Sequence, residues 1–164
     1  MIVNTSSKFQ REFSEVVKNV MLPSLLSYIA KPLVFFKPIK PNVFPKEWEE
    51  QDYLVRMYLF YFIPFGEQTI RIELLKSKEE GEFILRDNGF GTLIKKWDHW
   101  IFIKKIDEKE QIIYTDRVDI DAGILTPFIW IYAFTFYHWR QYRWRKLIRK
   151  NFKDLEAKKQ SIFR

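Results

Sequence analysis

A histidine and an aspartate lie on an otherwise apolar face of a predicted β-hairpin. Residues 92–106 and 111–121 alternate polar and apolar side chains, and residues 107–110 form a charged loop between them. Pairing the strands across this loop makes His99 and Asp116 diagonal neighbours within hydrogen-bonding reach, and a one-residue slip would mix the two faces. A carboxylate favours the imidazolium form while burial opposes it, so the pair could act as an acid/base element near neutral pH. It could equally orient a ligand or brace the sheet, because no nucleophile accompanies it.

Other kinds of chemistry have little support in the sequence. It has no cysteine, which excludes disulfides, thiol nucleophiles and thiolate metal sites. The histidines, His99 and His138, lie on different predicted elements, and neither belongs to a cluster with metal-ligand spacing. Residues 88–92 contain two glycines but lack the lysine and the following helix of a phosphate-binding loop. We therefore expect no metal, no other cofactor and no nucleotide hydrolysis.

The positive charge is concentrated near the C-terminus. The chain has 28 Lys and Arg against 21 Asp and Glu, which gives +7, and residues 140–164 hold ten of the basic and two of the acidic side chains. Such a helix end can contact an anionic membrane surface, or it can be a solvated end whose cations complement the helix dipole. Nucleic acid is not an expected partner, because residues 1–139 come to −1. The residues expected to contact an anionic surface are Arg140, Arg143, Arg145, Lys146, Arg149 and Lys150.

The first third of the chain predicts a strand followed by two short helices. Residues 2–9 can form the strand, and residues 12–20 repeat apolar side chains at helical spacing. Pro23 precedes a second helix over 24–30, and a short strand follows at 33–36. The next segment is expected to be a loop because it contains Pro38, Pro41 and Pro45.

A second hairpin is predicted before the one that carries His99. It pairs residues 52–62 with 67–76 across a turn at 63–66, and this register places Arg56 directly opposite Glu73. Residues 82–87 then form a further strand, which ends in a turn at Asn88-Gly89-Phe90-Gly91.

One long helix is predicted from Pro127 to about Ala157. Its apolar segment, residues 124–139, reaches only about 24 Å at about 1.5 Å per residue, so it is not expected to span a bilayer core of about 30 Å. The N-terminus has no secretory-signal pattern, so we expect a cytoplasmic location, with contact to the inner membrane surface as an option. The stripe expected to face the sheet is Leu125, Phe128, Ile129, Tyr132, Phe136 and Trp139. The opposite side of the helix is also apolar and could meet a loop, lipid or a second copy in a homodimer through Trp130, Phe134 and Tyr137.

Two neighbouring strands carry the most specific motifs, Lys96-Trp97-Asp98-His99-Trp100 and Thr115-Asp116-Arg117-Val118-Asp119. With the order of elements, they make the chain resemble the SRPBCC superfamily, the START-like helix-grip proteins that include bacterial ligand-binding members and polyketide cyclase/dehydratase proteins. The resemblance implies an α+β fold in which a curved antiparallel sheet of six to seven strands wraps around the C-terminal helix. It covers nearly the whole chain, so we expect one domain over residues 1–164 with a basic helix end at 140–164. It also implies a hydrophobic cavity between sheet and helix.

The expected function is binding of a hydrophobic or amphipathic small molecule, such as a lipid or a polyketide, in that cavity. The residues expected to contact it are Met57, Tyr61, Ile72, Trp97, His99, Tyr114, Asp116, Phe128, Tyr132 and Phe136. Enzymatic activity is less expected than binding. The alternatives are a cyclase- or dehydratase-like enzyme with His99 and Asp116 as acid and base, and a peripheral membrane or lipid-transfer protein that docks through the basic helix end. Arg117 is expected on the outer face near Trp100, although a slipped register would bring it beside His99 as an anion site.

Overall fold

The protein folds into a seven-stranded antiparallel sheet with one long helix packed on its concave side. The computed structural model describes residues 1–106 and 111–155, so the predicted loop at 107–110 and the end of the chain lie outside the described residues. The strands run in the order β1-β7-β6-β5-β4-β3-β2. Their bounds are β1 (Ile2–Gln10), β2 (Val34–Lys40), β3 (Asp52–Leu59), β4 (Ile63–Leu75), β5 (Glu82–Gly91), β6 (Lys96–Lys105) and β7 (Gln111–Asp121).

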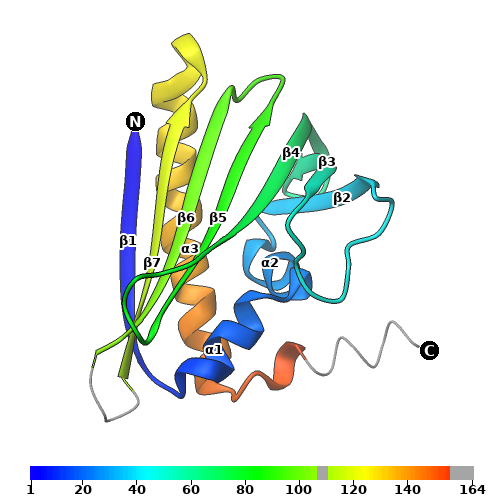
Figure 1. Ribbon diagram of the computed structural model, residues 1–164. Helices are drawn as coiled ribbons and strands as arrows, with labels where there is room; N and C mark the ends of the chain where they lie inside the picture. Colours follow the sequence, from blue (N-terminus) through cyan, green and yellow to red (C-terminus); the bar gives the residue numbers. More distant parts are fainter. Residues whose placement is uncertain (107–110, 156–164) are drawn as a thin grey trace, which may run out of the picture.

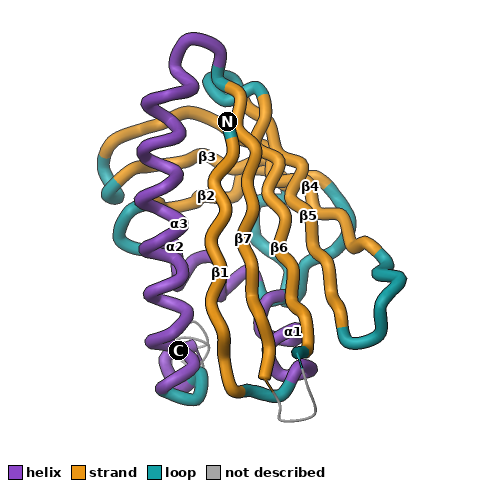
Figure 2. Tube along the Cα trace, turned by 90° about the vertical axis from the view of Figure 1, so that its left-hand side faces the viewer, coloured by secondary structure: helices purple, strands orange, loops and turns teal. Residues whose placement is uncertain are grey.

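The helices begin where the sequence predicts them, and they cover one side of the sheet. They are α1 (Phe13–Val20), α2 (Pro23–Ala30), the 3₁₀ turn η1 (Gly123–Leu125) and α3 (Thr126–Arg149). Figures 1 and 2 show that the sheet curves so that β2 and β3 turn toward α3, while α1 and α2 lie beside the C-terminal half of that helix. The expected helix-grip architecture, with two short helices after the first strand, is therefore confirmed.

The register of the β6–β7 hairpin is the predicted one. Ile101 lies opposite Asp116 and Trp97 opposite Ile120, so the apolar side chains of both strands share the concave face. Arg117 is exposed on the outer face across from Trp100, which excludes the slipped register. A different arginine, Arg86, lies over the Trp100 ring, with its guanidinium carbon 4.6 Å from the ring centre.

The register predicted for the β3–β4 hairpin is wrong. The chain reverses at residues 60–62, where Phe60 and Tyr61 adopt positive φ, and β4 already begins at Ile63. Arg56 therefore lies opposite Glu67 instead of Glu73, and its Nη2 is 2.6 Å from Glu67 Oε1. The reason for the error is that positive φ is unusual for aromatic residues, so the local turn signals at Pro64 and Gly66 pointed to the wrong site.

The predicted turn at residues 88–91 is instead the end of β5. Gly89 pairs with Trp97 and Gly91 with Gln68, so both glycines lie inside the sheet. A Cβ atom at Gly89 would lie 2.7 Å from the Thr69 carbonyl oxygen, and one at Gly91 would lie 2.6 Å from the Glu67 carbonyl oxygen. These positions are glycine because a neighbouring backbone approaches closely, and not because the chain turns.

Two further boundaries differ from the prediction. Strand β2 continues through Pro38 to Lys40, which is compatible with proline because β2 is an edge strand. Helix α3 ends at Arg149, because Asn151 and Phe152 adopt positive φ and Phe152 folds back against Trp144. No helix among residues 1–106 and 111–155 is long and apolar enough to cross a membrane.

Candidate functional site

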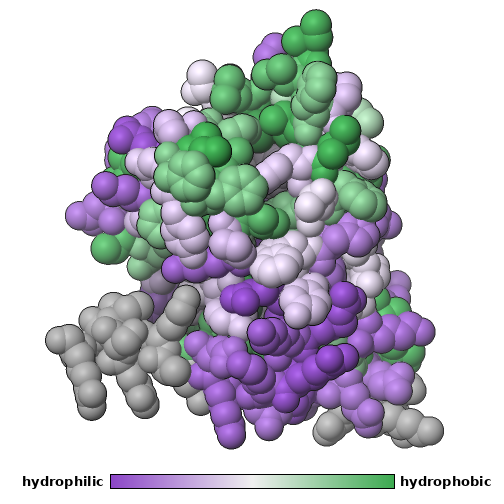
Figure 3. All heavy atoms as spheres, turned by 180° about the vertical axis from the view of Figure 1, so that it is seen from behind, coloured by the Kyte–Doolittle hydropathy of each residue, from purple (hydrophilic) through white to green (hydrophobic). Residues whose placement is uncertain are grey.

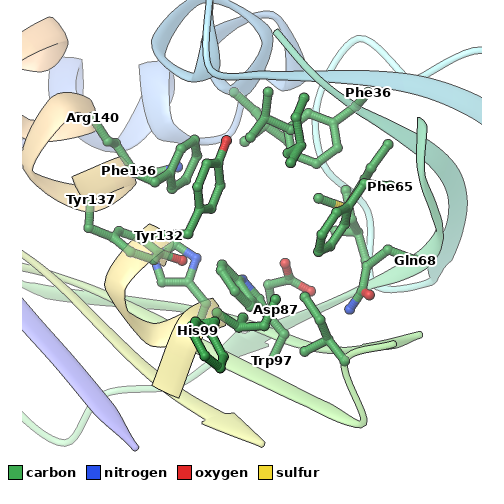
Figure 4. Close-up of a pocket in the computed structure, with 18 residues that line it drawn as sticks. Phe36, Phe65, Gln68, Asp87, Trp97, His99, Tyr132, Phe136, Tyr137 and Arg140 are labelled. Carbon is green, nitrogen blue, oxygen red and sulfur yellow. The ribbon is translucent and has the colours of Figure 1, made fainter. Parts of the chain in front are cut away.

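A cavity of about 210 Å³ lies between the curved sheet and the first half of α3. Figure 4 shows that side chains from the sheet and from the helix enclose it. Its walls are mostly aromatic and aliphatic, and the polar residues among them are Gln68, Asp87, His99, Tyr132, Tyr137 and Arg140. An apolar chamber with a few polar groups is typical of a small-molecule site.

Most of the residues predicted to contact a ligand line this cavity, and four do not. The lining members are Met57, Trp97, His99, Phe128, Tyr132 and Phe136. Tyr61 is exposed at the tip of the β3–β4 turn, because the hairpin reverses earlier than predicted. Ile72 lines a smaller neighbouring recess of about 40 Å³, and Tyr114 and Asp116 are fully buried behind the cavity wall.

Asp116 is the acceptor at the centre of a buried polar network. His99 Nε2 lies 2.9 Å from Asp116 Oδ1, which confirms the predicted hydrogen bond. The Tyr114 hydroxyl donates to the same oxygen at 3.0 Å, Gln141 Nε2 donates to Oδ2 at 2.8 Å, and Arg140 Nε lies 3.2 Å from Oδ1. Asp116 is only 1% exposed and does not reach the cavity, so the predicted acid/base pair does not face one ligand. Asp116 holds His99 in position instead.

The network determines the protonation of both partners. Burial alone would raise the pKa of Asp116, but the Arg140 charge and the hydrogen bond from His99 outweigh it, and the pKa lies below its usual value. Burial lowers the pKa of His99 even though Asp116 opposes the shift. His99 is therefore neutral at pH 7, with its Nε2 proton directed to Asp116. Its Nδ1 has no hydrogen-bond partner among the described residues, which leaves an acceptor at the cavity wall.

Asp87 is the most unusual residue of the cavity, and the sequence interpretation missed it. It lies on β5 directly opposite His99 on β6, and its Oδ1 accepts a hydrogen bond of 2.9 Å from the Arg71 backbone NH. Burial raises the pKa of Asp87 to about 8, although the Arg71 NH and the Arg140 charge oppose the shift. The carboxyl group is therefore mostly neutral at pH 7. The strand predicted over residues 82–87 includes Asp87, but its pairing with the neighbouring strands was not predicted, so the face on which Asp87 lies was not assigned.

Gln68 is the second polar residue that was missed. It is 8% exposed, and its Nε2 has no hydrogen-bond partner among the described residues. A Cβ atom at Gly89 would lie 3.0 Å from Asp87 Oδ1 and 3.5 Å from Gln68 Nε2, so the two polar ends converge above this glycine. The Tyr132 hydroxyl, in contrast, cannot donate to a ligand, because it donates to the Leu33 carbonyl oxygen at 3.0 Å.

The predicted surface of α3 needs two corrections. Arg140 is 4% exposed and belongs to the buried network, so it cannot contact an anionic surface. Arg143 is half-buried, with its guanidinium carbon 4.1 Å from the centre of the Tyr28 ring. The remaining basic residues are exposed, namely Arg145, Lys146, Arg149 and Lys150.

Tyr137 does not lie on the outer face of α3. It is buried against the rings of Trp97 and His99, at centroid distances of 6.1 and 4.9 Å. The predicted dimer patch is therefore reduced to Trp130, whose indole NH donates to the Ile2 carbonyl oxygen, and Phe134. Ala133, Phe136 and Tyr137 form one buried cluster with Val3, Val118 and Ile120 of the sheet, so the face of α3 that meets the sheet includes Tyr137. No group of three or more histidine, aspartate or glutamate residues with metal-ligand geometry occurs in the described part of the chain.

Comparison with known proteins identifies the fold. No protein-family model and no curated protein matches the chain. A hypothetical protein from Helicobacter pylori is similar with a TM-score of 0.63 at 10% identity, covering 87% of this chain and 84% of that one. A START superfamily protein from Mycobacterium smegmatis gives a TM-score of 0.55 at 6% identity, over 91% of this chain and 97% of that one. A conserved protein from Geobacillus kaustophilus gives 0.51 at 17% identity, over 90% and 97%. The chain therefore has the helix-grip fold of a START superfamily protein.

Proposed function

We propose that the protein binds a compact, largely apolar small molecule in the cavity between the sheet and α3. The observation that carries the proposal is a chamber with mostly apolar walls inside the hydrophobic core. Its volume of about 210 Å³ lies below the range of about 300–1,000 Å³ that is usual for drug-sized ligands. The volume therefore favours a molecule of one or two rings over a two-chain lipid.

The ligand enters at the N-terminal end of α3. Phe128 lines the cavity and is 72% exposed, so the chamber reaches the surface beside it. Arg140, three turns further along the helix, lines the cavity from its buried end. The entrance is thus far from the basic helix end, since α3 has 24 residues and spans about 36 Å.

Truncating Trp97 should enlarge the cavity. We expect Trp97→Ala to bind N-phenyl-1-naphthylamine, a neutral fluorescent probe, about tenfold more tightly than the wild-type protein, because the lost indole makes room for a larger ring system. Fluorescence titration measures this directly. Trp100→Ala is the matched control, because Trp100 lies on the outer face of the same strand and stacks on Phe102. Equal probe affinity in all three proteins would contradict the proposed position of the site.

A second proposed function is docking of the cavity entrance on a lipid bilayer, which would give the site access to membrane-dissolved ligands. Exposed apolar side chains surround the entrance on three segments, each of which also contributes a lining residue. We call them the mouth rim: Phe62, Ile63, Leu93, Ile124, Leu125 and Phe128. In Figure 3, which views the side of α3, hydrophobic residues gather on the upper part of this face and hydrophilic residues on the lower part.

The composition of the rim suits a bilayer with anionic lipid. Residues 59–66, 90–97 and 122–137 contain no carboxylate, and Lys95 is exposed between the rim segments. Apolar and aromatic loops with neighbouring cations are favoured at the boundary between headgroups and acyl chains. The exposed basic residues Arg149 and Lys150 lie about 30 Å along α3 from Phe128, so contact of the rim with a bilayer does not depend on them.

Flotation with vesicles of phosphatidylcholine and phosphatidylglycerol tests this proposal. We expect Phe62→Asp with Ile124→Asp to reduce the bound fraction about tenfold or more, while Arg149→Glu with Lys150→Glu leaves it nearly unchanged. Both pairs are exposed, so the fold should tolerate the changes. The reverse pattern would assign docking to the basic helix end. Absence of flotation, or rim-dependent dimerisation in sedimentation instead of lipid binding, would overturn the proposal.

A further inference from the structure

We propose that Gln68 and Asp87 form a pair of hydrogen-bond donors that holds a carbonyl oxygen of the ligand, so that the ligand is a compact cyclic ketone or a similar neutral carbonyl compound. This inference rests on the proposed binding function and adds the chemical class of the ligand. Figure 4 shows both side chains, together with His99, on the sheet side of the cavity.

The first argument is the convergence of the two side chains. They come from neighbouring strands, β4 and β5, and both polar ends lie within 3.5 Å of the point where a Cβ of Gly89 would be. Gly89 and Gly91 leave the space above the sheet that these ends occupy. Gln68 Nε2 is a buried donor without a partner in the described part of the chain, and such a group costs free energy unless a ligand satisfies it.

The second argument is the direction of the hydrogen bonds. Asp87 Oδ1 already accepts from the Arg71 NH, which leaves the other carboxyl oxygen for the cavity. Other charged or titratable groups near this carboxyl are Glu73 on β4, Asp98 and His99 on β6, and Tyr137 and Arg140 on α3. In this surrounding the carboxyl keeps its proton at pH 7 and can donate it to an acceptor. The two groups therefore offer two donors to one oxygen.

The third argument separates a carbonyl from charged alternatives. An ammonium group would pair with Asp87 only if this buried carboxyl lost its proton, and the Arg140 cation nearby would repel the ligand. A carboxylate would need an uncompensated cation, but the Arg140 charge is matched by Asp116 at 3.2 Å. A neutral acceptor such as a carbonyl oxygen needs neither an ionised carboxylate nor an unpaired cation in the cavity. A hydroxyl on the same ligand would find its acceptor in His99 Nδ1.

Four matched compounds test the inference: 2-tetralone, tetralin, 2-aminotetralin and tetralin-2-carboxylate. They share one ring system and differ in the polar group, and competition with a fluorescent apolar probe gives their affinities. We expect 2-tetralone to bind about tenfold more tightly than tetralin at pH 7, and its affinity to fall as the pH rises above about 8.

Asp87→Leu and Gln68→Leu should each remove most of this preference for 2-tetralone without weakening the binding of tetralin. Asp87→Asn should keep part of the preference, because its amide still donates, and should lose the pH dependence.

Glu67→Gln is the matched control, because Glu67 is exposed on the outer face of β4 next to Gln68 and pairs with Arg56. Equal affinity for tetralin and 2-tetralone would overturn the carbonyl site while the proposed binding function stands. Tightest binding of the amine or of the carboxylate would overturn it in favour of a charged ligand. If none of the four compounds binds, the binding function fails as well.

Discussion

Replacing Asp116 with alanine should destabilise the fold by about 3–5 kcal/mol, the cost of leaving a buried charge without its partner. Arg140 is 4% exposed and would lose the carboxylate that lies 3.2 Å from its Nε. His99, Tyr114 and Gln141 would lose a common acceptor at the same time. Urea unfolding at pH 7 measures the loss as a change in the free energy of unfolding.

Asp119→Ala is the matched control for this variant. Asp119 lies on the same strand but on the outer face, where it pairs with Lys96 and the N-terminus, so its loss should cost about 1 kcal/mol or less. Asp116→Ala combined with Arg140→Met should be more stable than Asp116→Ala alone, because the uncompensated charge is gone. An Asp116 variant no less stable than the Asp119 variant would show that the network does not hold sheet and helix together.

The same network predicts part of the acid unfolding. The folded pKa of Asp116 lies below the unfolded value of about 3.9. Its stabilisation is therefore complete above that pH and is lost as the pH falls through the folded pKa.

The β6–β7 hairpin shows what the sequence could predict. Apolar residues alternate over the whole length of both strands, so only one register buries Ile101, Ile103, Val118 and Ile120 together. That register also placed His99 next to Asp116. The order of elements and the concave face followed from the same kind of pattern, since burial of one face constrains every strand.

The errors arose where tertiary contacts override local signals. Two aromatic residues in the left-handed region make the β3–β4 turn, and no propensity argument predicts them there. Gly89 and Gly91 resemble a turn in the sequence, but they are needed because the β4 backbone passes too close for a side chain. Asp87 and Gln68 both lie within predicted strands, at 82–87 and 67–76, but only the tertiary structure places them at the cavity and distinguishes them from solvated polar residues. Tyr114 and Asp116 were predicted to line the cavity because the two-residue period of a strand predicts the face on which a side chain lies. It does not predict where along that face α3 packs directly on the sheet and leaves no cavity.

Asp87→Asn should make the protein more stable at alkaline pH. The pKa of Asp87 is about 8 in the folded state, against about 3.9 for an unfolded aspartate. Between these values the folded state binds a proton that the unfolded state has lost, so wild-type stability falls as the pH rises. Each pH unit in this range costs the wild-type protein up to about 1.4 kcal/mol of stability, and the partial exposure of Asp87 reduces the total. We expect the variant to gain about 2–4 kcal/mol over the wild-type protein at pH 9.

Urea unfolding at pH 5, 7 and 9 measures this gain for each protein. The difference between Asp87→Asn and the wild-type protein should be smallest at pH 5, should grow toward pH 8 and should then level off, because both states of the wild-type protein are ionised above the folded pKa. Asp52→Asn is the control with the opposite sign, because the Arg71 side chain lowers the pKa of Asp52 and its contribution is already complete at pH 5. A stability difference for Asp87→Asn that is the same at all three pH values would show that Asp87 ionises as it does in the unfolded chain. A ligand that hydrogen-bonds the neutral carboxyl should delay the loss of wild-type stability to higher pH, since binding to one protonation state stabilises that state.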